Sequence, residues 1–93
     1  MIVSFRHKGL KRLFETGDRS KLQQDMVERI ERVLTVLHSA TSVEEIAAVQ
    51  NLRLHQLQGK LKGFWSVTVR ANWRIVFTMN GDEIGDVDFV DYH

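Results

Sequence analysis

Residues 64–79 decide the fold, and they read Phe64-Trp65-Ser66-Val67-Thr68-Val69-Arg70-Ala71-Asn72-Trp73-Arg74-Ile75-Val76-Phe77-Thr78-Met79. Apolar and polar residues alternate from Trp65 to Arg70, which is the two-residue period of a half-buried strand. The alternation returns with Ile75, Phe77 and Met79. The pattern therefore predicts two strands of a hairpin that share one apolar face.

The length of the loop between these strands decides which residues face each other. A loop of two residues would place Val69 opposite Arg74 and so set an apolar side chain against a charge. A loop of three residues, 71–73, pairs Val69 with Ile75 instead, and Asn72 tolerates the left-handed backbone that such loops usually contain. We therefore expect the three-residue loop.

The three-residue loop also places Arg70 directly opposite Arg74 on the polar face. Like charges that face each other destabilise a strand pair, and a broken local rule is typical of a functional site. A phosphate bound by both guanidinium groups would relieve the repulsion. The alternative is that the two side chains are solvated and splay apart.

The first half of the chain carries the signals of helices. Ser4 and Gly17 are placed to begin and end the first of them, and Ser20 and Ser42 each begin a capping box. The second has apolar residues at helical spacing throughout. The expected helices cover residues 5–15, 21–38 and 43–48.

The second half predicts strands. Residues 51–57 alternate, and a glycine-bounded basic loop, 58–63, separates them from the hairpin. Asn80-Gly81 is a strong turn signal. In the last strand Ile84 is out of phase with Val87, and a bulge near Gly85 would bring both to one face.

Helices followed by a four-strand meander predict an α+β fold, with N-terminal helices packed on one face of a twisted antiparallel sheet. The other face should be open and partly polar. A chain of 93 residues with 43% apolar residues fits one domain, residues 1–93, with a small core.

Charge is unevenly distributed along the chain. Residues 46–81 contain five basic residues and no acidic one, and residues 82–93 contain five acidic residues and no lysine or arginine. A basic zone suits a polyanion-binding surface, although it is also typical of a solvated face. The absence of cysteine excludes disulfides and thiolate metal sites. The basic start of the chain argues against a signal peptide or membrane span, so we expect a cytoplasmic protein.

Several residues of the second half have the side chains that metal-independent RNA cleavage requires. That reaction needs a base for the 2′-hydroxyl, an acid for the 5′-oxygen and positive charge near the phosphorus, and histidine and arginine suit these tasks. The candidate residues are His55, Asp91, Tyr92 and His93 with Arg70 and Arg74. A metal site from His55, Asp88, Asp91 and His93 is an alternative that no spaced ligand motif supports.

Three segments of the chain together resemble the HigB-type toxins of the RelE superfamily. They are Leu54-His55-Gln56-Leu57, the run from Trp65 to Ile75 that contains Val69-Arg70-Ala71-Asn72-Trp73-Arg74, and the terminal Asp91-Tyr92-His93. The opening segment 4–15 is similar to the first helix of the same family. The resemblance covers nearly the whole chain.

This resemblance implies a RelE-like microbial RNase fold and a toxin of a type II toxin–antitoxin pair. Such a toxin is a ribosome-dependent, metal-independent endoribonuclease that cuts mRNA in the A site and needs no cofactor. The catalytic residues would be His55, Asp91, Tyr92 and His93, and the phosphate or RNA contacts would be Arg70, Arg74, Lys60 and Lys62. The family often has lysine where this chain has Gln58, and Lys60 would take its place.

The resemblance further implies a helix-turn-helix, HigA-like antitoxin as the partner, with operator DNA bound only through that antitoxin. The ribosome, mRNA and rRNA would be the other partners, and no membrane is implied. Asp91 or His55 would serve as the base and His93 as the acid. Two other functions remain open from the residues alone: a non-catalytic nucleic-acid-binding module that uses the same basic face, and a protein-interaction domain.

Overall fold

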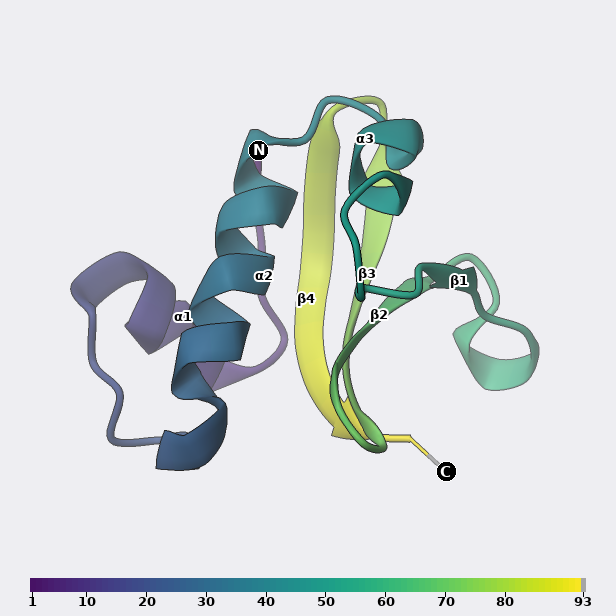
Figure 1. Ribbon diagram of the computed structural model, residues 1–93. Coiled ribbons are helices and arrows are strands. Elements are labelled where there is room, and N and C mark those ends of the chain that lie inside the picture. The colour runs from purple at the N-terminus through teal and green to yellow at the C-terminus, as the bar shows by residue number, and fades with distance from the viewer. Residues whose placement is uncertain (93) are drawn as a thin grey trace.

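The computed structural model describes residues 1–92. Its elements are α1 (Lys8–Thr16), η1 (Gln24–Met26), α2 (Val27–Ser39), α3 (Val43–Ala47), β1 (His55–Gln56), η2 (Gly59–Leu61), β2 (Trp65–Arg70), β3 (Trp73–Asn80) and β4 (Glu83–Asp91). The strands pair antiparallel in the order β1-β2-β3-β4. The helices cover one face of this sheet, and β1 and η2 lie at its far edge (Figure 1). The predicted α+β arrangement is confirmed.

The main core lies between the helices and the sheet. Its largest fully buried side chains come from both layers, and they include Leu10, Met26, Ile30, Leu37 and Ile46 from the helical half and Val67, Ile75, Phe77, Ile84 and Val87 from the strands. The helical residues among them recur at the spacing that forms one apolar stripe. The strand residues lie on the single sheet face that the helices cover.

The first helix begins three residues later than the sequence predicts. Ser4 does not cap it, because the Ser4 hydroxyl accepts a hydrogen bond from the Asp86 N–H (2.8 Å). Phe5 instead forms a bridge beside β4, as Ile2 does. His7 is the residue that caps α1, and Gly17 ends it in the left-handed conformation as predicted.

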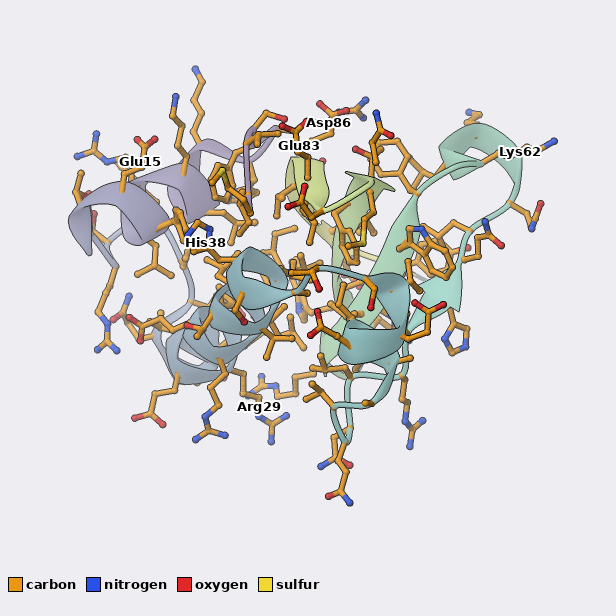
Figure 2. All side chains as sticks on the ribbon, turned by 90° about the horizontal axis from the view of Figure 1, so that it is seen from above. Glu15, Arg29, His38, Lys62, Glu83 and Asp86 are labelled. Carbon is orange, nitrogen blue, oxygen red and sulfur yellow. The ribbon has the colours of Figure 1, made fainter. Side chains whose placement is uncertain are left out.

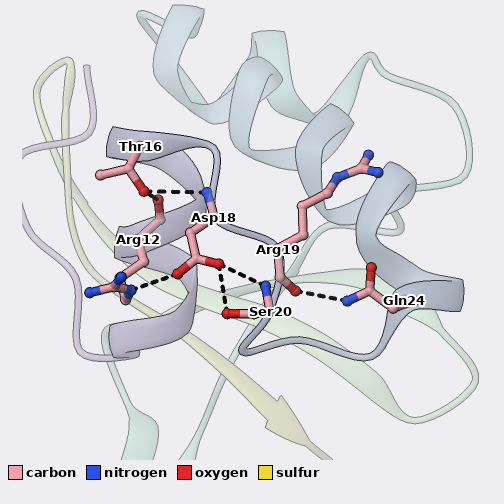
Figure 3. A network of polar contacts seen from close by, with 6 residues as sticks. All are labelled: Arg12, Thr16, Asp18, Arg19, Ser20 and Gln24. Atoms are coloured by element: carbon pink, nitrogen blue, oxygen red, sulfur yellow. Dashed lines mark hydrogen bonds and ion pairs between the residues drawn. The ribbon is translucent and has the colours of Figure 1, made fainter.

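The loop between α1 and η1 is held by Asp18 (Figure 3). Asp18 accepts hydrogen bonds from the hydroxyl (2.7 Å) and the N–H (2.9 Å) of Ser20, and from Arg12 Nε (2.9 Å). The bonds from Ser20, followed by the contact with Arg12, hold the pKa of this carboxyl well below its ordinary value of 3.8. Because its hydroxyl binds Asp18, Ser20 does not cap a helix, and the helical segment begins at Gln24 instead of the predicted residue 21.

The first strand is much shorter than predicted. Within residues 51–57, the strand ladder with β2 contains His55 and Gln56, and Leu52 adds one backbone bond by accepting from the Thr68 N–H (2.7 Å). Asn51 and Arg53 have positive φ angles of 72° and 51°. These backbone conformations are incompatible with an extended strand, so the alternation of side chains was misleading here.

The β2–β3 register differs from the expected one. The loop is Ala71-Asn72, Arg70 pairs with Trp73, and Thr68 pairs with Arg74. Two residue steps on β2 therefore match one step on β3, which is a β-bulge at Val69. The bulge removes the conflict between Val69 and Arg74 that argued against a two-residue loop. The predicted three-residue loop, and with it the Arg70–Arg74 pair, is wrong.

The bulge predicted near Gly85 is confirmed. Val76 pairs with Asp88 and Thr78 pairs with Gly85, so β4 has one extra residue over this interval. Asp86 lies within this bulge, and its φ angle is 51°. Ile84 and Val87 are consequently both fully buried on the helix side.

Acid should weaken the loop that Asp18 holds. Because folding lowers this pKa, the stability contributed by Asp18 is fully present above 3.8 and is lost as the pH falls below that value through the folded pKa. We expect Asp18→Asn to unfold at lower urea concentration than the wild type at neutral pH, and this difference should shrink in acid. Ser20→Ala should show a weaker version of the same pH dependence. A difference that stays constant between neutral and acidic pH would contradict the assignment.

Candidate active site

The helix-free face of the sheet carries one row of side chains across all four strands. His55 pairs with Ser66, Ser66 with Val76, and Val76 with Asp88. Paired residues point to the same side of a sheet. We call this side the open face, and Arg74 belongs to its next row, between Thr68 and Val90.

A small apolar cluster holds the segment that carries His55 against the open face. Leu57, Phe64 and Val76 are buried together, and Leu61 and Val90 pack against them. The Leu57 N–H donates to the Phe64 carbonyl (2.9 Å), which closes the loop of η2. This cluster positions β1, although β1 has only two paired residues of its own.

His55 is exposed, and a contact with a backbone carbonyl indicates which nitrogen of its ring carries the proton. Nδ1 lies 2.7 Å from the carbonyl oxygen of Arg53. A carbonyl oxygen only accepts, so Nδ1 must carry a proton. Nε2 is then the nitrogen that can take up or release a proton in a reaction.

Arg74 is half-buried on the central strand β3. Its Nη1 donates to the carbonyl oxygen of Ala71 (2.7 Å), which orients the guanidinium group toward the hairpin loop. The ion pairs described within residues 1–92 involve Arg6, Arg12, Arg19 and Arg70, and Arg74 takes part in none of these four. Its remaining donors can therefore bind an anion in the fork geometry that suits phosphate.

Lys60 and Lys62 lie in η2 and directly after it, and both are exposed. Lys62 projects outward at the margin of the molecule, far from α1 (Figure 2). Neither lysine forms an ion pair with the described carboxylates. They give the β1 side of the open face a basic border.

Arg70 does not lie on the open face. Its Nη1 is 2.7 Å from Asp25 Oδ2, at the start of the helical segment that leads into α2. The bulge at Val69 brings Arg70 into the row of Trp73, whose neighbour on β4 is Asp91. The prediction that Arg70 and Arg74 share a face is wrong for this reason.

The C-terminal candidates lie beside the β2–β3 loop. The Tyr92 N–H donates to the Asn72 carbonyl (2.8 Å), and the Tyr92 side chain is 47% exposed. Asp91 ends β4 opposite Trp73, so it belongs to the row of Trp73 and Arg70 and not to the open face. His93 lies outside the described residues, so the convergence of His55 with His93 stays a prediction.

The sequence indicated Asp88 only as one ligand of an alternative metal site that included His55, and it did not single out Asp25. Asp88 lies on the open face in the row of His55, and the alternation along β4 was the signal that could have found it. Asp25 binds Arg70, and no sequence pattern indicates that contact. Within residues 1–92 no three His, Asp or Glu side chains come together in a way that would bind a metal ion. Over the same residues every helix is too short or too polar to span a bilayer.

Comparison with known sequences identifies the family of the chain. Residues 3–93 match the family model described as a RelE-like toxin of the type II toxin–antitoxin system HigB. The chain is 44% identical over 93 residues to Endoribonuclease HigB of Proteus vulgaris, with all of both chains covered. It is 28% identical over 78 residues to Toxin HigB-1 of Vibrio cholerae, which covers 83% of this chain and 82% of that one.

Solved structures share the fold at low sequence identity. A mutant of YafQ from E. coli superposes with a TM-score of 0.68 and 15% identity, over 98% of this chain and 91% of that one. The YoeB–YefM toxin–antitoxin complex from Staphylococcus aureus gives a TM-score of 0.63 and 18% identity, over 100% and 95%. These similarities support the same arrangement of helices and sheet.

The neutral form of His55 should be the Nδ1–H tautomer, and two other histidines provide a contrast. Nδ1 of His7 and Nδ1 of His38 each accept a backbone N–H, so their neutral rings must carry the proton on Nε2. Long-range ¹H–¹⁵N NMR correlation distinguishes the two tautomers. If His55 shows the same pattern as His7 and His38, the contact with the Arg53 carbonyl is not formed in solution.

Proposed function

Because this chain belongs to the family of RelE-like HigB toxins of type II toxin–antitoxin systems, we propose that its open face cleaves messenger RNA in the ribosomal A site. The relative that is 44% identical over its full length is named an endoribonuclease, and at that identity the activity extends to this chain. The observation that carries the choice of surface is the strand pairing, which brings His55 and Arg74 to the same face. Its site of action would be the cytoplasm, where ribosomes translate.

The two side chains are spaced for one phosphodiester group. His55 and Arg74 lie two strands apart across the sheet and two residues apart along the strand direction. With ordinary strand and residue spacings, their Cα atoms are about 12 Å apart. The Arg74 guanidinium is directed toward the hairpin loop by its bond to the Ala71 carbonyl, so it would turn toward His55 when a phosphate binds between them. A phosphate between them would contact the Arg74 guanidinium and the Nε2 of His55.

The proposed reaction needs no metal and no second reactant. A base removes the proton of the 2′-hydroxyl, and the 2′-oxygen forms a bond to phosphorus while the bond from phosphorus to the 5′-oxygen breaks. An acid returns a proton to that 5′-oxygen. Arg74 would stabilise the negative charge on the phosphorane.

The acid and base would come from His55 and the C-terminal residues Asp91, Tyr92 and His93. The free Nε2 of His55 supports its role as base, and His93 would be the acid. Asp91 is the alternative base, and it would act from the end of the hairpin because its row contains Trp73 and Arg70. The roles of Asp91, Tyr92 and His93 rest on the family resemblance. The hydrogen bond from Tyr92 to the hairpin loop supports their place near Arg74.

The basic border would guide the RNA backbone and the ribosomal RNA. Lys60 and Lys62 lie along the β1 side, and Lys60 would stand in for the family lysine that is absent at Gln58. Asp88 makes the β4 side of the open face less favourable for phosphate. Arg70, which the resemblance implied as an RNA contact, binds Asp25 and lies off the open face, so it has no part in the proposed phosphate site.

Removal of the catalytic groups should slow cleavage without unfolding the protein. Alanine in place of His55 or His93 should lower the single-turnover rate on programmed ribosomes by about 10²–10⁴-fold, and Arg74→Ala by about 10²–10³-fold. With Mg²⁺ kept at the level that the ribosomes need, a chelator selective for transition metals should leave the rate unchanged, because the proposed reaction uses no bound metal.

Two exposed residues provide matched controls. Gln56→Ala alters the neighbour of His55 on the opposite side of β1, and Arg32→Ala removes an exposed arginine from α2. Both should retain the wild-type rate. Unchanged rates for the His55, His93 and Arg74 variants would exclude the open face as the cleaving surface. RNA binding without cleavage by the wild type would favour the non-catalytic module.

We also propose a HigA-like antitoxin with a helix-turn-helix domain as the partner, and operator DNA would bind only through it. Lys8 and Lys11 on α1 are exposed, whereas Arg12 is paired with Asp18. An acidic surface on the antitoxin would complement the two lysines.

We expect Lys11→Glu to weaken the complex in low salt more than the equal charge change Arg32→Glu. The measurement is the dissociation constant, obtained by titrating each toxin variant with the separately purified antitoxin. Equal effects of the two variants would contradict binding of the antitoxin at the α1 lysines.

A further inference from the structure

The tip of the β2–β3 hairpin, residues 69–73, is anchored to the helical layer. Arg70 Nη1 lies 2.7 Å from Asp25 Oδ2. Arg29 Nη1 donates to the Val69 carbonyl at 3.2 Å. Both contacts join the start of the α2 region to the bulged part of β2, where the strand ladder is interrupted.

The same hairpin tip holds two groups of the proposed cleaving surface. The Ala71 carbonyl accepts from Arg74 Nη1 (2.7 Å), and the Asn72 carbonyl accepts from the Tyr92 N–H (2.8 Å). The end of β4 lies beside this loop in the fold (Figure 1). A shift of the hairpin tip would therefore move the guanidinium of Arg74 and the C-terminal segment together.

We propose that Asp25 is a positioning residue for RNA cleavage, because it fixes Arg70 and through it the hairpin tip. The inference rests on the proposed function. Asp25 touches neither Arg74 nor Tyr92, and it acts through the backbone carbonyls that orient them. Both members of the pair are about half exposed, with side-chain exposures of 45% for Arg70 and 57% for Asp25. Exposed ion pairs contribute little to global stability, so an effect on position can be separated from an effect on unfolding.

A charge swap distinguishes this role from direct binding of phosphate by Arg70. Asp25→Arg and Arg70→Asp should each lower the single-turnover cleavage rate by about tenfold, within the range expected for small misplacements of catalytic groups. The double variant re-forms the pair in reverse and should recover most of the rate. If Arg70 binds phosphate instead, the double variant will stay as slow as Arg70→Asp, and the positioning role is overturned.

The pair of Arg19 and Glu31 is a matched control on the same helical layer. Its N–O distance is 2.8 Å and its side-chain exposures are 51% and 44%. The bond described between these two side chains does not involve residues 69–73. Glu31→Arg, Arg19→Glu and their double variant should all cleave at the wild-type rate, and a loss equal to that of Asp25→Arg would make the effect a general one of surface charge.

Hydrogen exchange gives a readout that does not depend on activity. Asp25→Arg should speed exchange of the Tyr92 amide, which is bonded to Asn72, while the urea midpoint stays near that of the wild type. Glu31→Arg should leave this amide unchanged. Unchanged Tyr92 exchange in Asp25→Arg would overturn the inference. A wild-type protein that fails to cleave on ribosomes would instead overturn the proposed function, and the exchange result would still test the positioning of the hairpin tip.

Discussion

The pairing of β2 with β3 is the constraint on which the rest of this structure depends. The bulge at Val69 lets a two-residue loop close the hairpin while Val67 still pairs with Ile75 in the core. One extra residue on a strand reverses the side to which the next residue points. Arg70 is therefore carried toward the helices, and Arg74 remains on the open face.

Bulges on both sides leave β3 as the regular strand between two irregular ones. One interrupts β2 at Val69, and the other interrupts β4 at Asp86. Bulges concentrate next to functional sites because they change the direction of a side chain without breaking the sheet. Here they keep the apolar residues of both neighbours buried and leave Arg74, on the undistorted strand, with a fixed direction.

One face of the sheet carries most of the buried core, and the other carries the residues proposed for cleavage. The helix-covered face carries the main core, and the open face carries only the cluster around Leu57, Phe64 and Val76. That small cluster is sufficient to hold a short edge strand, because burial of a few apolar side chains contributes about 1.5–3 kcal/mol each. His55 can consequently be exposed and still have a defined position next to Ser66.

The sequence alone determined the fold class, the open face and the family, because hydrophobic periodicity and local motifs are properties of neighbouring residues. It also predicted the bulge near Gly85, since Ile84 and Val87 are out of phase along the chain. Only the tertiary structure decided the hairpin register, because a bulge and a longer loop satisfy the same alternation. It likewise decided the side of the sheet to which Arg70 points. The partner of Arg70, Asp25, lies 45 residues earlier in the sequence and is brought near only by packing of the helices on the sheet.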